Sequence, residues 1–502
     1  MLIKLYNPFF IKGCCCLIAG AILPLAFSPF DYYLIAILSL AVLFLFWLNA
    51  TPKQALTYGY LYGFGMFGTG VNWVHISINL FGDVNLAGAL ALTFLLVAFL
   101  ALYPAVAGFM HCHYFKPRKA ITLTLILPAL WTLAEWCREW VLTGFPWLNL
   151  GNSQIDSPLA GLAPLLGVYG VSFAVCFCAG CLVYLTGCSL KGRMITLISL
   201  SILWLASQLL LQHQWTHRDP ESLSIALIQG AIPQGIKWSP EQRQQTFELY
   251  LGLTDSHWES DIVVWPETAI PAFYHQAKAF IDSLDAVAEV HDTALLTGIP
   301  YRDNDSKKFF NSILLLGKEE GIYHKRHLVP FGEYLPFNKL LRPLLYFLKI
   351  PISEFSPGTG DVNPLIIKKA SIGLTVCYED VFGKEVIKTL PRATLLLNVS
   401  NDAWFGDSIA PHQHLQIARM RALETGRYLL RATNTGISAV INEKGKIISR
   451  SPQFTAAALT ADVYTFQGAT PYVTAGNWTI VISCLTILLV NFLQLRKKQT
   501  CD

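Results

Sequence analysis

Long apolar runs separated by short polar connections fill the first 212 residues, and one more apolar run lies near the end of the chain. A segment of roughly 20 apolar residues is long enough to cross the hydrocarbon core of a bilayer as a helix. The pattern therefore predicts eight membrane-spanning helices, at residues 11–28, 32–50, 55–78, 86–110, 119–140, 158–188, 193–212 and 478–495.

Charged residues in the connections predict the orientation of these spans. Alternate connections carry the positive charges Lys4, Lys12, Lys53, Lys116, Arg118, Lys119, Lys191, Arg193, Arg496, Lys497 and Lys498. The opposite connections carry the acids Asp31, Asp83, Glu139 and Asp156. By the positive-inside rule, both termini are cytoplasmic and residues 218–475 face the outer side. The first span could instead be a cleaved signal peptide, but the positive and negative connections alternate sides of the membrane only if this span is retained.

The composition agrees with a membrane protein. Hydrophobic residues make up 53% of the chain and charged residues 14%, with a mean hydropathy of +0.44, whereas about a quarter of the residues of a soluble protein are charged. The net charge of +4 is too small to indicate nucleic acid as a partner. We expect a membrane domain of seven helices at 1–217, an extracytoplasmic domain at 218–475, and a closing helix with a basic tail at 476–502.

The expected extracytoplasmic domain has the pattern of an α/β fold. Short β-rich runs bounded by turn residues predict strands at 223–229, 261–265, 293–298, 312–316, 371–376, 394–399, 437–442, 446–449 and 457–463. Apolar residues at three- and four-residue spacing predict helices at 240–254, 274–291 and 413–425. The tripeptide Glu443-Lys444-Gly445 predicts a hairpin between two late strands.

Cys377 is the only cysteine between Cys188 and Cys484. The other eleven of the 12 cysteines lie in or beside apolar runs or at the carboxyl-terminal tail, where a small polarizable side chain is tolerated. A lone thiol is more often structural than nucleophilic, so a catalytic role requires partners. An oxidising periplasm would favour that role, because a domain with one cysteine cannot form an internal disulfide.

Three motifs supply possible partners. The apolar run 261–265 is stopped by Pro266 and places Glu267 at the end of a strand, where α/β folds present their sites. The segment 323–333 sets His324, Lys325 and Arg326 beside an apolar run, and the strand at 371–376 leads directly into Cys377. Each motif alone also fits a solvated turn or a surface carboxylate.

Together these motifs resemble the Glu-Lys-Cys triad of the nitrilase superfamily, and the flanking residues resemble one branch, the apolipoprotein N-acyltransferase family. The matching segments are 265–267, 325 with 327–333, 377–379 and 400–406. The resemblance covers essentially the whole chain and implies an α-β-β-α sandwich beside the membrane helices. It also implies a thiol nucleophile at Cys377, a general base at Glu267 and an oxyanion-stabilising cation at Lys325.

The resemblance implies further site residues and partners. Supporting or substrate-binding roles fall to Trp238, Asn311, Glu333, Tyr378, Glu379 and Trp404, with Glu333 and Glu379 equally able to orient Lys325 or a substrate amine. The implied substrates are a phospholipid acyl donor and a diacylglyceryl-modified apolipoprotein acceptor, in the bacterial inner membrane. We expect no cofactor, no metal and a monomer; His412 and His414 lack a nearby ligand set.

Two alternatives use the same residues differently. A membrane-anchored nitrilase-type amidase would act on small amides, although one anchor would then suffice. A transporter would account for the spans but would leave the triad unused. The apolar segment 335–350, interleaved with Lys339, Arg342 and Lys349, is predicted to lie in the membrane interface and admit lipid; packing on its own domain is the alternative.

Overall fold

The structure is a computed structural model that describes residues 8–82, 84–115, 119–336, 354–360 and 362–499. Contacts divide the chain into two compact units. The first comprises Met1–His75, Leu86–His213 and Thr474–Asp502, and the second comprises Ile76–Asn85 and Gln214–Val473. The predicted lipid-admitting segment falls almost entirely outside the described residues, so its role stays a prediction.

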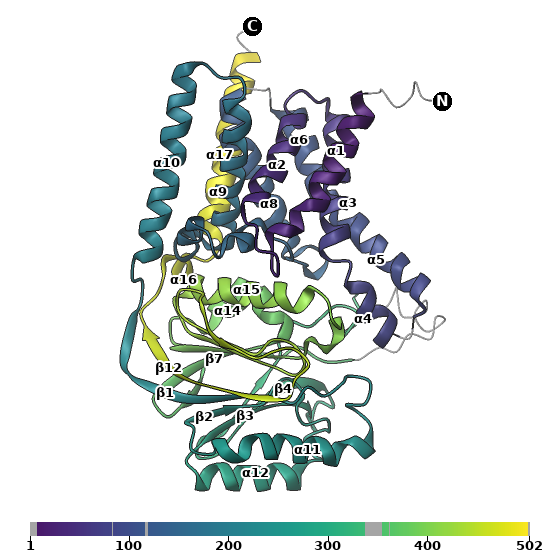
Figure 1. Ribbon diagram of the computed structural model, residues 1–502, viewed down its shortest axis with the longest axis vertical. Coiled ribbons are helices and arrows are strands. Elements are labelled where there is room, and N and C mark those ends of the chain that lie inside the picture. Colours follow the sequence, from purple (N-terminus) through teal and green to yellow (C-terminus); the bar gives the residue numbers. More distant parts are fainter. Residues whose placement is uncertain (1–7, 83, 116–118, 337–353, 361, 500–502) are drawn as a thin grey trace. The chain divides into compact units, whose positions relative to one another are not determined.

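The first unit is built of helices (Figure 1). Its main helices are α1 (Pro8–Ile22), α2 (Leu34–Trp47), α3 (Pro52–Gly70), α5 (Leu86–Leu100), α6 (Leu102–Tyr114), α8 (Leu127–Arg138), α9 (Ala163–Leu185), α10 (Leu190–Gln212) and α17 (Trp478–Gln499). Within the described residues, six helical segments have the length and hydropathy to cross a bilayer: Pro8–Ala26, Leu86–Tyr114, Lys119–Arg138, Pro158–Leu185, Leu190–Gln212 and Trp478–Lys497. Helix α2 is apolar but shorter, and α3 is rich in glycine and tyrosine, which is why fewer segments qualify than the eight predicted.

Two details of this unit differ from what the pattern of residues along the chain predicts. The predicted span 55–78 ends as a helix at Gly70, and a separate helix α4 (Val74–Phe81) follows it. The tryptophans around Glu135 and Arg138 favour interfacial anchors, but both charged side chains are buried inside the unit. Glu135 accepts hydrogen bonds from Trp131 Nε1 and the Leu150 amide, each at 2.9 Å. A buried polar group needs such partners, and the sequence pattern did not reveal them.

The second unit contains two six-stranded sheets. One has the order β12 (Ala457–Gln467), β1 (His217–Gln229), β2 (Ile262–Val264), β3 (Ala294–Arg302), β4 (Phe309–Leu316), β5 (Gly321–His324). The other has the order β11 (Ile447–Arg450), β10 (Ala439–Ile441), β9 (Leu429–Thr433), β8 (Leu395–Ser400), β7 (Ala370–Val376), β6 (Leu365–Ile367). Strands β1, β2 and β3 are parallel, as are β7, β8 and β9.

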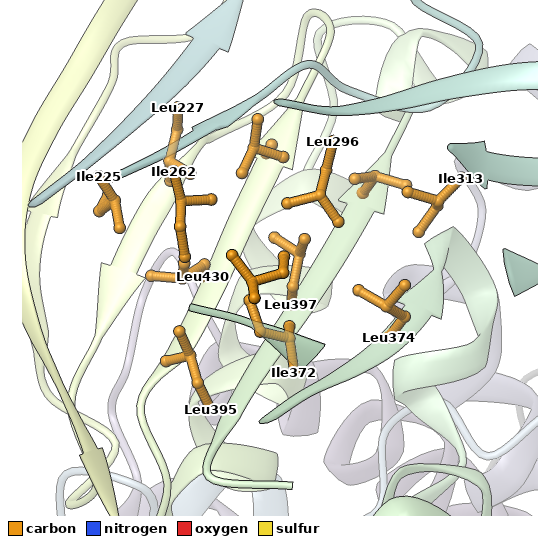
Figure 2. Close-up of a cluster of buried hydrophobic side chains, with 14 of the residues drawn as sticks. Ile225, Leu227, Ile262, Leu296, Ile313, Ile372, Leu374, Leu395, Leu397 and Leu430 are labelled. Carbon is orange, nitrogen blue, oxygen red and sulfur yellow. The ribbon is translucent and has the colours of Figure 1, made fainter. Parts of the chain in front are cut away.

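The two sheets pack face to face around an apolar core (Figure 2). Alternate residues of each strand point into this core because successive side chains of a strand face opposite sides; Ile225 and Leu227 of β1 meet Leu395 and Leu397 of β8 there. The intervening residues face helices instead. Helices α11 (Pro240–Thr254) and α12 (Lys278–Val290) cover the first sheet, and α15 (Ala410–Thr425) covers the second. The predicted α-β-β-α sandwich is confirmed.

The predicted strands all have counterparts, but three observed strands were missed. These are β5, β6 and β9, of four, three and five residues. The hairpin at 443–445 joins β10 and β11, which pair antiparallel as predicted.

Candidate active site

Glu267 lies just beyond β2, at the carboxyl end of the parallel strands. Trp265 and Pro266 precede it, and the Trp265 ring is fully buried, with its Nε1 donating to Thr254 Oγ1 at 3.0 Å. Gly298 of β3 lies against this segment so closely that a Cβ there would be 2.7 Å from the Glu267 Cα. The Glu267 side chain is buried, and its Oε2 has no hydrogen-bond partner among the described residues.

Lys325 follows β5 and is held by its main chain and its ammonium group. Its amide donates to the Asn311 carbonyl at 2.8 Å. Its Nζ lies 2.9 Å from both carboxylate oxygens of Glu333 and 4.0 Å from Glu267 Oε1. Burial alone would lower the pKa of Lys325, but the negative charges of Glu333 and Glu267 outweigh it and raise this pKa. The ammonium is therefore charged at neutral pH.

Cys377 lies at the end of β7, where the chain turns into the short helix η8 (Cys377–Val381). Its φ of 52° is in the left-handed region, which a residue with a Cβ adopts only when the surroundings impose it. Burial, and then the charge of Glu267, raise the pKa of the thiol well above its usual range, while Lys325 and a hydrogen bond with Ser400 act in the opposite direction. The resting side chain is therefore a thiol.

The structure separates the two carboxylates whose duties the sequence left open. Glu333 contacts Lys325, and both Glu333 Oε1 and Glu267 Oε1 accept from Asn311 Nδ2, at 3.0 and 2.7 Å. Glu379 instead accepts from main-chain amides and from one tyrosine hydroxyl. Its partners are Arg326 N at 2.6 Å, His327 N at 3.0 Å, Val376 N at 2.7 Å and Tyr323 Oη at 2.9 Å.

These contacts tie the segment after Lys325 to the strand that carries Cys377. Burial raises the pKa of Glu379 to about 7, even though the amides of His327, Arg326 and Val376 lower it. Glu379 thus joins the two halves of the site, whereas Glu333 is the ion-pair partner of the lysine.

The aromatic candidates occupy different surroundings. Tyr378 is buried and packs edge-on against Phe382, with ring centroids 5.0 Å apart. Trp238 and Trp404 are exposed over 48% and 37% of their surface. The Trp404 ring meets Phe81 of the 76–85 segment in an edge-to-face contact at 4.9 Å. Exposed indoles near the site are available to contact a substrate, and their roles stay predictions.

A second buried cluster lies behind Cys377 and was not predicted. Arg431 bridges Asp380 and Asp402 at 3.2 and 2.9 Å, and His414 contacts the same two carboxylates at 2.8 and 3.1 Å. Arg431 also donates to Asn398 Oδ1 at 2.9 Å. In turn, Asn398 Nδ2 donates to the Cys377 carbonyl at 3.2 Å.

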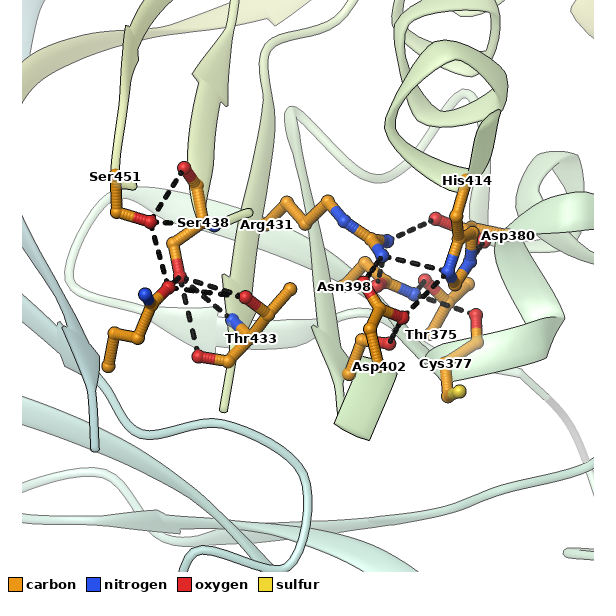
Figure 3. A network of polar contacts seen from close by, with 12 residues as sticks. Thr375, Cys377, Asp380, Asn398, Asp402, His414, Arg431, Thr433, Ser438 and Ser451 are labelled. Atoms are coloured by element: carbon orange, nitrogen blue, oxygen red, sulfur yellow. Dashed lines mark hydrogen bonds and ion pairs between the residues drawn. The ribbon is translucent and has the colours of Figure 1, made fainter. Parts of the chain in front are cut away.

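Figure 3 shows the Cys377 carbonyl facing this cluster and its sulfur pointing away. The sequence pattern around His414 raises only the question of a metal ligand. The described residues contain no group of three or more His, Cys, Asp or Glu side chains arranged to hold a metal ion.

Lys237 was also missed. Its side chain is buried and donates to the Glu267 carbonyl at 3.1 Å and to Thr268 Oγ1 at 2.7 Å. One signal was available in the sequence: the charged residue Lys237 lies between two apolar residues, Ile236 and Trp238.

Comparison with known proteins decides the family. The family models described as Apolipoprotein N-acyltransferase N-terminal domain and Carbon-nitrogen hydrolase match residues 19–181 and 224–467. The apolipoprotein N-acyltransferase of Methylococcus capsulatus is 43% identical over 96% of this chain and 96% of its own length. The chain belongs to the apolipoprotein N-acyltransferase family.

Other relatives agree with this family. The apolipoprotein N-acyltransferase of Coxiella burnetii is 42% identical over 95% of this chain and 99% of its own length. Among solved structures, the carbon-nitrogen hydrolase of Helicobacter pylori is 17% identical, with a TM-score of 0.37, and the match covers 48% of this chain and 88% of that one. The two apolipoprotein N-acyltransferase relatives therefore match residues of both units of the chain.

Proposed function

We propose that this protein transfers an acyl chain from a phospholipid, through a thioester on Cys377, to the N-terminal amine of a diacylglyceryl-modified bacterial apolipoprotein. The observation that carries the proposal is the grouping of one buried thiol with a buried carboxylate and a charged lysine. The lysine lies 4.0 Å from Glu267, and both charges act on the thiol. Identity of more than 40% over nearly the full length to apolipoprotein N-acyltransferases supports lipid substrates over small amides.

In the first half-reaction, the Cys377 sulfur attacks an ester carbonyl of the phospholipid while Glu267 takes the thiol proton. A base is needed because the raised pKa leaves the resting thiol protonated. The carbonyl oxygen becomes an oxyanion beside the Lys325 ammonium, which a fixed cation in a buried site stabilises. The carbon–oxygen bond then breaks, Glu267 returns the proton to the leaving alkoxide, and a lysophospholipid departs.

In the second half-reaction, the amine of the acceptor attacks the thioester carbonyl. Glu267 accepts the amine proton, and Lys325 again stabilises the oxyanion. The carbon–sulfur bond breaks and the Cys377 thiolate recovers a proton from Glu267, so an amide is formed and the enzyme returns to its starting state. Sulfur serves both steps because it is a strong nucleophile as thiolate and a good leaving group.

The proposal includes a location. We place the protein in the bacterial inner membrane as a monomer, with both termini in the cytoplasm and the catalytic unit in the periplasm. The alternating charges of the connections support this orientation. A cysteine introduced at Gly252 of α11, where a Cβ meets open space, should react with a membrane-impermeant maleimide added to cells with a permeabilised outer membrane. Labelling only after the inner membrane is broken would contradict the orientation.

The decisive experiment follows the mass of Cys377. The purified chain is incubated with a defined phospholipid and then with a diacylglyceryl peptide, and each product is measured by intact mass spectrometry. An acyl-sized, hydroxylamine-labile adduct should form and then pass to the peptide amine. The Cys377→Ala variant should form no adduct, whereas Cys484→Ala, which removes a buried cysteine of α17, should behave as the wild type.

Two other outcomes would change the conclusion. Discharge of the acyl group to water alone, with hydrolysis of small amides, would support the nitrilase-type amidase. Absence of any adduct on the wild type would contradict acyl transfer. The predicted lipid-admitting segment is tested separately: replacing Leu344 and Phe347 by serine should impair turnover of lipid while the fold persists, and unfolding would instead support packing on the domain.

A further inference from the structure

Lys237 is a buried lysine in a turn whose neighbours point outward. The lysine is only 1% exposed, whereas the apolar residues Ile236 and Trp238 on either side are 45% and 48% exposed. Burying an ammonium costs several kcal/mol unless it is well paired, and exposing an isoleucine and a tryptophan gains nothing. This turn therefore inverts the usual arrangement, which indicates that the inward position of the lysine has a role.

The two contacts of Lys237 fall on the backbone around Glu267. Its Nζ donates to the main-chain carbonyl of Glu267 at 3.1 Å and to the hydroxyl of Thr268 at 2.7 Å. Thr268 has a φ of 49°, a conformation that is strained for a β-branched residue. The lysine thus binds both sides of a strained peptide that sets the direction of the Glu267 side chain.

Charge gives Lys237 a second effect on the same residue. Burial lowers the pKa of Lys237 to about 8, against which the negative charge of Glu267 acts. The other charged groups facing Glu267 are Lys325, at 4.0 Å, and Glu333, which shares the Asn311 amide with it. Lys325 is itself paired with Glu333, and Lys237 is a second buried cation that interacts electrostatically with Glu267.

We propose that Lys237 is a positioning residue for the general base, holding the Glu267 backbone at its strained turn so that the carboxylate is placed for proton transfer from Cys377. The inference rests on the proposed role of Glu267 as base. It assigns Lys237 no contact with substrate, and it predicts that loss of the lysine changes the pH at which Cys377 becomes reactive.

The test is alkylation of Cys377 by iodoacetamide in the full-length protein, followed at a series of pH values by mass spectrometry of the peptide that contains Cys377. This readout needs neither lipid nor acceptor, so it is independent of whether acyl transfer occurs. In Lys237→Met, the alkylation rate should begin to rise at a pH about one unit higher than in the wild type. The reason is that loss of a nearby positive charge raises the pKa of an acidic group by about that much. The maximal rate should fall by roughly tenfold, because the base is misplaced.

Three variants decide between positioning and a merely structural role. Lys237→Arg should recover most of the wild-type pH dependence. Thr268→Val, which removes one acceptor and keeps the charge, should lower the maximal rate without moving the pH dependence. Lys278→Met, the same substitution at an exposed lysine paired with Asp282, should change neither quantity. An unmoved pH dependence in a folded Lys237→Met variant, or a shift that Lys237→Arg fails to reverse, would overturn the proposal.

Discussion

Two buried groups of charges flank Cys377, and they differ in how completely their oxygens are paired. In the support cluster of Asp380, Asp402, His414 and Arg431, all four carboxylate oxygens accept a hydrogen bond. In the reacting cluster of Glu267, Lys325 and Glu333, the Glu267 Oε2 has no partner among the described residues. Every carboxylate oxygen of the first cluster is paired, whereas the second cluster keeps one acceptor open.

This difference indicates that the two clusters have different roles, one in stability and one in the reaction. An unsatisfied buried acceptor costs about 1–3 kcal/mol, so a fold selected only for stability would pair the Glu267 oxygen as it pairs those of Asp380 and Asp402. The open oxygen belongs to the carboxylate whose charge acts on the thiol of Cys377. We infer that the support cluster fixes the strand end that carries the cysteine, while the reacting cluster keeps a proton acceptor available.

The largest effect is expected from Glu267→Gln. Loss of the base should slow thioester formation on the order of 10⁴-fold, measured by the rate of acyl-adduct appearance in the mass spectrum. The thermal midpoint should fall by much less than in a variant of the support cluster, because Lys325 keeps Glu333 as its ion-pair partner and Lys237 keeps its two hydrogen bonds. A large drop in that midpoint would show that the reacting cluster also holds the fold, and the contrast between the clusters would fail.

Arg431→Met should produce the opposite pattern. Without the guanidinium, Asp380 and Asp402 face each other as buried charges balanced only by His414, and breaking such a cluster costs about 3–5 kcal/mol. We expect a large fall in the thermal midpoint in detergent and loss of folded protein. Arg419→Met is the matched control: this half-buried arginine donates to the Gly445 carbonyl, and its loss should cost about 1 kcal/mol. An unchanged midpoint for Arg431→Met would contradict the assignment.

The same contrast explains which parts of the site the sequence could predict. Glu267 and Cys377 each follow a predicted strand and Lys325 lies in a short motif, but the resemblance to the nitrilase triad was needed to single out the three together, and their catalytic roles stay predictions. The members of the support cluster come from η8, the residues after β8, α15 and β9, and Asp380 and Arg431 are separated by 51 positions.

Nothing local marks such residues as partners, and Arg431 interrupts the apolar run of β9, which was not predicted. Lys237 was missed for a related reason, because its role depends on a contact with a residue 30 positions away. For the fold, the short β-rich runs predicted an α/β domain and the family resemblance implied the sandwich, whereas the split between α3 and α4 depends on packing that the hydropathy of 55–78 does not contain.

Glu379→Gln and Glu333→Gln should separate two glutamates that the sequence could not distinguish. In Glu379→Gln, the amide nitrogen of the new side chain would face main-chain N–H groups that now donate to a carboxylate, leaving at least one of them unsatisfied at a cost of about 1–3 kcal/mol. We expect a lower thermal midpoint for Glu379→Gln. Glu333 accepts from only one main-chain amide, Val329 N at 2.8 Å, so Glu333→Gln should lower the thermal midpoint less and should mainly slow thioester formation. Equal thermal midpoints for the two variants would contradict this division.

The support cluster should also lose part of its stabilising effect at low pH. Burial alone would raise the pKa of Asp402, but the positive charges of Arg431 and His414 outweigh it and hold this pKa below its usual range. A carboxyl group with a lowered pKa in the folded state contributes stability above its unfolded value of roughly 3.9, and this contribution is lost as the pH falls through the folded value. The difference in thermal midpoint between wild type and Asp402→Asn should therefore shrink below about pH 4. A difference that stays constant with pH would show that the ionised form of Asp402 contributes nothing.

The smallest effect is expected at Ser400, which touches both clusters. Its hydroxyl donates to Asp402 Oδ1 at 3.1 Å, and when the hydroxyl turns to donate to Cys377 instead, it lowers the pKa of the thiol against the stronger effect of burial. Ser400→Ala removes about 1 kcal/mol of hydrogen bonding, so alkylation of Cys377 should slow about fivefold at a fixed pH. If the clusters act separately, the effect of Ser400→Ala should be the same in the wild type and in Asp402→Asn. A much smaller effect in the double variant would show that Ser400 transmits the charge of Asp402 to the nucleophile, and the support cluster would then tune the chemistry as well as the fold.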